Sequence, residues 1–162
     1  MRVRQCGGKQ LGFGLCGALM LVAAGAAWAD DANPFIGRWH WDQAQSKLPP
    51  GEPAPADMIL DFSRVDSLHV RWSVTTTDAQ QRKSTETYDT PANGEFYPID
   101  SATTAAFRLS GTALQATFKG PAGETDTMNC ALSSDQRKMT CRGTLTSTDG
   151  KTATYLDVYD RD

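Results

Sequence analysis

The chain has 162 residues, of which 40% are hydrophobic and 22% charged, and its net charge is −3. All 19 acidic residues but only 13 of the 16 basic residues follow residue 29, so residues 30–162 carry a net charge of −6. This balance argues against a nucleic-acid or anionic-membrane partner, because either would require a basic surface.

The first 29 residues have the pattern of a secretory signal peptide. Three basic residues precede an apolar stretch at 11–26, and Ala27-Trp28-Ala29 follows with small residues at the two positions that signal peptidase reads. We therefore expect residues 1–29 to be removed, leaving residues 30–162 as one domain with no stable membrane anchor. The alternative is a retained anchor, since residues 11–29 are just long enough to span a bilayer.

The exported part predicts an all-β domain. An early strand is expected around Trp39 and Trp41, and the proline-rich segment 49–55 is expected to be a crossover rather than a strand. Residues 67–77 place apolar side chains at every second position, as residues 58–62 do just before them. This period of two is typical of half-buried strands, and the two runs predict a hairpin.

The same alternation continues to the end of the chain. Further strands are expected within 105–110, 113–118, 128–132, 139–143 and 152–159, with turn residues between them. In total, roughly eight to ten short strands predict a single, closed or nearly closed antiparallel barrel. The alternative architecture is a β-sandwich.

Two cysteines remain after residue 29. If residues 133–138 form a hairpin turn, Leu132 pairs with Met139 and Cys130 faces Cys141 directly, within reach of a disulfide. An even pair suits an oxidising compartment. A structural bond is expected rather than a redox-active one, because redox pairs usually sit close together near a helix start.

The aromatic residues are the candidates for a ligand cavity. Trp39 and Trp41 share one face of their strand and either close the barrel base or line a cavity, and Trp72 lies in the middle of its strand. Phe96 and Tyr97 fall on opposite faces, so one of them points outward or into an opening. Trp39, Trp41, Trp72 and Tyr97 are therefore the cavity candidates.

No catalytic arrangement is evident. The only histidines, His40 and His69, lie on the face opposite the tryptophans, no G-x-S-x-G motif marks a nucleophile, and no spacing predicts a metal site. We therefore expect a non-enzyme without metal or cofactor. A dispersed pair of carboxylates remains an alternative, because spacing in sequence does not fix spacing in space.

Short motifs spread over the exported part resemble those of a known group. The segment Gly37-Arg38-Trp39 resembles the G-x-W signature of lipocalin-type barrels. Other segments are similar to those of small, secreted, lipocalin-like bacterial proteins: Ser46-Lys47, Pro50-Gly51, Tyr97-Pro98, Ser134-Asp135, Lys138-Met139-Thr140, Asp149-Gly150-Lys151 and Val158-Tyr159-Asp160-Arg161. The resemblance implies a barrel able to hold a small apolar ligand, and it implies no catalytic residues.

These observations favour a periplasmic, non-enzymatic barrel that binds a small apolar molecule. The alternative is a structural or protein-interaction module of the cell envelope, because Trp39, Trp72, Phe107 and Phe118 are bulky enough to fill the interior. A third hypothesis is a hydrolase, and a cleft holding two acids with raised pKa values would support it.

Overall fold

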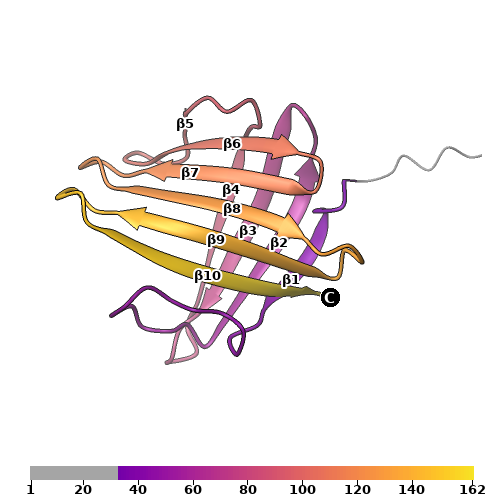
Figure 1. Cartoon of the computed structure of the whole chain (residues 1–162), viewed down its shortest axis with the longest axis horizontal. Coiled ribbons are helices and arrows are strands. Elements are labelled where there is room, and N and C mark those ends of the chain that lie inside the picture. Colours follow the sequence, from indigo (N-terminus) through magenta and orange to yellow (C-terminus); the bar gives the residue numbers. More distant parts are fainter. Residues whose placement is uncertain (1–32) are drawn as a thin grey trace, which may run out of the picture.

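The computed structural model describes residues 33–162, which form ten strands and no helix (Figure 1). The strands are β1 (Gly37–Trp41), β2 (Asp57–Val65), β3 (His69–Thr77), β4 (Lys83–Pro91), β5 (Tyr97–Pro98), β6 (Thr104–Ser110), β7 (Ala113–Lys119), β8 (Thr125–Leu132), β9 (Lys138–Thr146) and β10 (Thr152–Arg161). No helix in this part of the chain could cross a membrane. The expected signal peptide lies outside the described residues.

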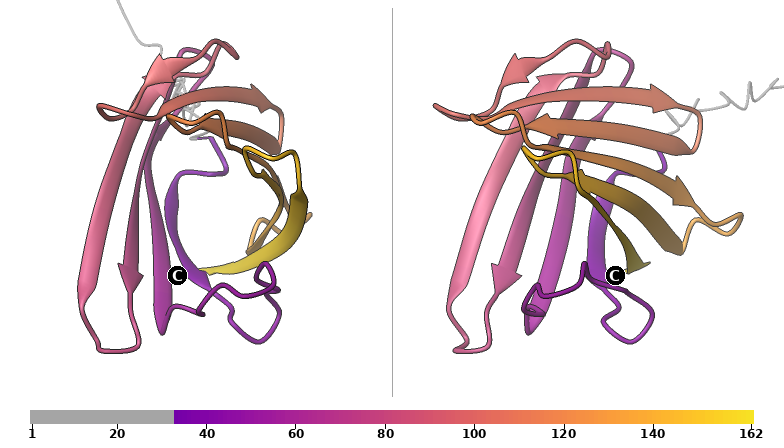
Figure 2. Two further views of the ribbon diagram at one scale, coloured as in Figure 1. Left: turned by 90° about the vertical axis from the view of Figure 1, so that its left-hand side faces the viewer. Right: turned by 60° about the vertical axis from the view of Figure 1, so that its left-hand side comes forward.

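All of these strands belong to one antiparallel sheet, in the order β4-β3-β2-β1-β10-β9-β8-β7-β6-β5. β1 pairs with β2 on one side and with β10 on the other, so it joins the N-terminal strands to the C-terminal strands in one sheet, and this sheet curls into a barrel (Figure 2). The ends of this order approach one another at an isolated bridge between Asn93 and Arg108. The predicted nearly closed antiparallel barrel is confirmed, and the sandwich alternative is not found.

Aromatic side chains fill the barrel where β4 and β6 approach each other and few backbone hydrogen bonds join the two sides. Trp72 on β3 packs edge-on against Phe107 on β6, with ring centroids 4.6 Å apart. Tyr88 on β4 packs against Phe118 on β7 at 6.0 Å. Such edge-to-face pairs stabilise a core beyond the area that they bury. The barrel is thus closed on this side by side chains rather than by a strand ladder.

The base of the barrel is held by Trp39 and Arg161, which lie directly opposite each other on β1 and β10. Trp39 is fully buried, and the Arg161 guanidinium lies 4.2 Å from its ring centroid. Arg161 also donates hydrogen bonds to the carbonyl oxygens of Pro34, Ile36 and Gln136. A single side chain therefore ties the last strand to the segment before β1 and to the β8–β9 turn.

Gly37 makes room for this arrangement. Its φ is +126°, a conformation that side-chain-bearing residues rarely adopt, and an added Cβ would lie 3.1 Å from an Arg161 nitrogen. The G-x-W motif therefore combines a tight backbone approach at Gly37 with the buried ring of Trp39.

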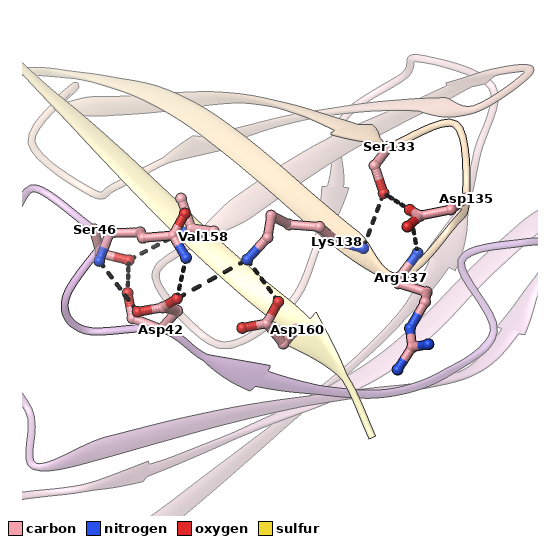
Figure 3. Close-up of polar contacts among 9 residues, drawn as sticks. Asp42, Ser46, Ser133, Asp135, Arg137, Lys138, Val158 and Asp160 are labelled. Atoms are coloured by element: carbon pink, nitrogen blue, oxygen red, sulfur yellow. Dashed lines mark hydrogen bonds and ion pairs between the residues drawn. The ribbon is translucent and has the colours of Figure 1, made fainter.

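A polar network joins the segment after β1 to the last strand (Figure 3). The Asp42 amide donates to the Val158 carbonyl at 2.8 Å, and the Val158 amide donates to Ser46 Oγ at 3.0 Å. Lys138 Nζ lies 2.6 Å from Asp160 and 3.9 Å from Asp42. The chain beyond β1 thus continues along the edge of β10 before it crosses the barrel.

The hairpins predicted from alternation are present. The run at 58–62 lies in β2, and residues 69–77 of the second run form β3, which pairs with β2. The inward position expected for Leu68 is wrong, because Leu68 lies in the turn before β3 and is 70% exposed. Leu132 pairs with Met139, and Cys130 faces Cys141 with their Cα atoms 3.9 Å apart and a disulfide between them. The predicted disulfide is therefore confirmed.

Replacing Arg161 by Met should destabilise the fold by about 2–4 kcal/mol, because three carbonyl oxygens lose a charged donor and Trp39 loses its stacked cation. Urea unfolding measures the change. Arg142→Met is the matched control, since Arg142 is an exposed strand residue. Equal stabilities of the two variants would contradict the role given to Arg161.

Replacing both Cys130 and Cys141 by Ser should lower the free energy of unfolding by roughly 2–4 kcal/mol, because the bond restricts the unfolded chain. Thermal unfolding in oxidising buffer measures this loss, and adding a reductant should bring the wild type down to the level of the variant. An unchanged melting curve would show that the bond contributes nothing.

Candidate functional site

The interior of the barrel contains a cavity of about 270 Å³. Its wall is contributed by strands on both sides of the barrel and is mostly apolar. The lining residues are Met58, Leu60, Phe62, Trp72, Val74, Tyr88, Phe118, Asp126, Met128, Cys130, Asp157 and Tyr159. The bulky aromatic residues therefore fill one part of the interior and leave another part hollow.

A second cavity, of about 260 Å³, lies under the proline-rich crossover. Leu48, Pro49, Glu52, Pro53 and Pro55 form its wall on the crossover side. It shares Met58, Asp126 and Asp157 with the first cavity, so the two are adjacent. The crossover between β1 and β2, predicted not to be a strand, thus covers the hollow part of the barrel.

Asp157 is the most buried acid in the described residues that line the cavities. It is 8% exposed, and its Oδ1 accepts a hydrogen bond of 3.0 Å from Trp41 Nε1. Its other oxygen accepts no hydrogen bond from residues 33–162. Residues 157, 159 and 161 share one face of β10, because side chains alternate along a strand. Arg161 stacks on the buried Trp39 ring, so this face points into the barrel and Asp157 points inward with it.

Asp126 on β8 is held by a tyrosine from two strands away. The Tyr155 hydroxyl lies 2.9 Å from both carboxylate oxygens of Asp126. Tyr155 crosses the intervening strand β9 at Gly143, where an added Cβ would lie 1.8 Å from the tyrosine ring. A glycine inside a strand often marks such a close approach, and this signal was available in the sequence.

Burial is the main influence on both carboxylates. Desolvation raises the pKa of Asp157, the hydrogen bond from Trp41 opposes this increase, and the charge of Glu52 adds to it. Desolvation likewise raises the pKa of Asp126, against the hydrogen bond from Tyr155 and with the charges of Asp157 and Glu52. The residues that line the two cavities include no Lys, Arg or His to offset these acids.

The structure distributes the four cavity candidates over the barrel. Trp72 lines the cavity, and its Nε1 has no hydrogen-bond partner among residues 33–162. Trp41 lines neither cavity but donates the hydrogen bond that positions Asp157. Trp39 packs under Arg161 at the base of the barrel. Tyr97 accepts a hydrogen bond from Asn93 and lines neither cavity. Contact of these residues with a ligand stays a prediction.

The sequence analysis did not single out Asp126, Asp157 or Tyr155. Two acids with raised pKa values in one cavity are the arrangement that the hydrolase hypothesis requires. Each acid has a single hydrogen-bond donor within residues 33–162: the Tyr155 hydroxyl is shared by both oxygens of Asp126, and Trp41 donates to one oxygen of Asp157. Both carboxylates therefore keep unused acceptor capacity. His40 and His69 pair with Asp57 and Asp89 and line neither cavity.

No group of three metal-binding side chains occurs within residues 33–162. The two cavities together offer a mostly apolar chamber whose wall carries three acids, Glu52, Asp126 and Asp157, and three tyrosines, Tyr88, Tyr155 and Tyr159.

Comparisons with known proteins identify the fold. No protein-family model and no curated protein matches the sequence. Among solved structures, the chain is similar to the wild-type fluorescent protein UnaG, with 17% identity, a TM-score of 0.52 and coverage of 79% of this chain and 97% of the other.

Two further similar structures are those of proteins named for the bile acid or fatty acid that they bind or transport. The zebrafish ileal bile acid-binding protein complexed with cholic acid has a TM-score of 0.54, 12% identity and coverage of 80% and 99%. A mutant of the REP1-NXSQ fatty acid transporter has a TM-score of 0.51, 13% identity and coverage of 81% and 100%. At these identities the likeness shows a shared barrel fold.

The stability of an Asp157→Asn variant should depend on pH in a defined way. A raised pKa in the folded protein means that the buried charge destabilises the fold at neutral pH and that this effect disappears as Asp157 is protonated. Asparagine keeps the acceptor for Trp41 and carries no charge beside Glu52 and Asp126. The variant should therefore gain stability relative to the wild type as the pH rises from about 4 to about 7.

Thermal unfolding of both proteins across this range gives the difference, in which the effects of acids remote from Asp157 cancel. Asp126 contributes in the same direction, because loss of the Asp157 charge also relieves the repulsion that raises its pKa. Asp61→Asn on the outer face of β2 is the control, since Asp61 is exposed. A stability difference that is the same at both ends of the range would contradict the buried-charge interpretation.

Proposed function

We propose that this chain is an exported, non-enzymatic barrel that binds one small apolar molecule in the cavity between β2–β4 and β7–β10. The observation that carries this proposal is the cavity itself, whose wall is mostly apolar side chains with a few polar groups. Ligand sites in proteins commonly have this composition. The filled-core alternative requires an interior without such space.

The structural neighbours support the same proposal. Two of them are a bile acid-binding protein and a fatty acid transporter, and they match 80% and 81% of this chain. Neither description is that of an enzyme. In the present chain, residues 33–162 expose only two large hydrophobic side chains, Leu68 and Phe96, which offers little apolar surface for a protein partner.

The bacterial periplasm is the compartment we propose. The basic and apolar pattern of residues 1–29 supports export, and the Cys130–Cys141 disulfide suits an oxidising environment. The resemblance to secreted, lipocalin-like bacterial proteins agrees with this location.

Native mass spectrometry of the exported protein tests the proposal directly. We expect a bound small molecule that is released on unfolding. We also expect the polypeptide to have the mass of residues 30–162. A chain that carries no ligand and binds no octan-1-ol in calorimetric titration would contradict the carrier function. If the protein were a hydrolase, the molecule released on unfolding would have the mass of a cleavage product rather than that of an intact ligand.

Filling the cavity should abolish binding. Met128→Trp and Val74→Phe each add bulk to the wall, and each should weaken binding of octan-1-ol about tenfold or more because the apolar space is lost. Asn129→Trp is the matched control, since Asn129 is the exposed neighbour of Met128 on β8. Binding that survives in both folded filling variants would place the ligand elsewhere.

A further inference from the structure

The acids of the cavity have no basic counterpart. Asp126 and Asp157 line both cavities, Glu52 lines the second, and the lining residues include no Lys, Arg or His. Buried acids are normally paired, because an uncompensated charge in a medium of low dielectric is costly. A molecule bound in this chamber would therefore experience a negative electrostatic potential that no basic lining residue offsets.

Among the acids of the cavity, Asp157 is the most buried one with an oxygen that accepts no hydrogen bond from residues 33–162. It is 8% exposed and lies between the two cavities, and Trp41 engages only one of its oxygens. Asp126 is held by Tyr155, so its position is fixed while its charge stays uncompensated. Both side chains are thus oriented before any ligand arrives.

An anionic headgroup does not fit such a chamber. A carboxylate would meet two acids and no cation, and like charges at close range in a desolvated site repel strongly. A protonated amine would instead donate hydrogen bonds to Asp157 and neutralise charge, and charge-assisted hydrogen bonds of this kind are the strong ones. The apolar wall formed by Leu60, Phe62 and Val74 suits the remainder of such a molecule.

We propose that the ligand of this barrel is a cationic amphiphile, namely an apolar molecule that carries a protonated amine, with the amine bound by Asp157 and Asp126 and the apolar part in the cavity. This inference rests on the proposed carrier function and names its ligand class. It separates the chain from a carrier of fatty acids or bile acids.

Calorimetric titration of the purified protein with octylamine, octan-1-ol and octanoate at neutral pH tests the headgroup, because the three probes share one alkyl chain. We expect octylamine to bind about tenfold or more tightly than octanoate, with octan-1-ol between them. Octanoate binding as tightly as octylamine would overturn the inference while leaving the carrier function intact. Failure of all three to bind would overturn both.

Substitutions of the two aspartates test whether the amine group of the ligand binds there. Asp157→Asn should weaken octylamine about tenfold and change octan-1-ol binding less than about twofold, because only the charge is lost. Asp126→Asn is a second variant with the same expected pattern, and the exposed Asp61→Asn should leave both probes unchanged. Equal weakening of octylamine and octan-1-ol in folded Asp157→Asn and Asp126→Asn proteins would overturn the assignment.

The pH dependence gives an independent readout. Octylamine keeps its charge below neutral pH, so its affinity should rise between about pH 4 and pH 7 as Asp157 and Asp126 lose protons in the presence of Glu52, Tyr155 and Tyr159. The affinity for octan-1-ol should stay flat over this range. An octylamine affinity that falls with rising pH would overturn the proposal.

Discussion

The pairing of β1 with β10 is the constraint on which both the closed barrel and its cavity depend. Trp39 lies opposite Arg161 with the guanidinium over its ring, so the face of β10 that carries Arg161 points inward. Because strand side chains alternate, Tyr155 and Asp157 must then face the interior as well. A slip of one residue would turn Leu156 and Val158 inward and both polar groups outward. The contact that closes the base thus also gives the cavity its acidic wall.

The interior is divided because large and small side chains are unevenly distributed around it. Trp72, Tyr88, Phe107 and Phe118 fill the barrel across the gap between β4 and β6. On the other side, Gly143 has no side chain, so the Tyr155 ring can lie over β9 and its hydroxyl can reach Asp126. The position of one acid in the cavity wall therefore depends on this glycine.

Much of the fold was predictable from the sequence, because apolar alternation in β2, β3, β6 and β7 is clear and the turn at 133–138 fixed the disulfide register. β4 was not predicted, since Lys83–Pro91 carries polar residues on both faces and lies at an edge of the sheet. The acidic site was not predicted either. In β10, Leu156 and Val158 compete with Tyr155 and Tyr159 as the apparent core face, and only the pairing with Trp39 decides between them.

The hydrogen bonds that the two acids accept do not require a charge. Asparagine at position 157 would still accept the Trp41 hydrogen bond, and asparagine at position 126 would still accept that of Tyr155, without the cost of desolvating a charge. Burial raises the pKa of both aspartates, which means that the fold is less stable with them ionised. Groups that destabilise an isolated fold in this way are common where a site interacts with a ligand. The stability of the barrel therefore does not account for the acidic wall, whereas the cationic ligand proposed above does.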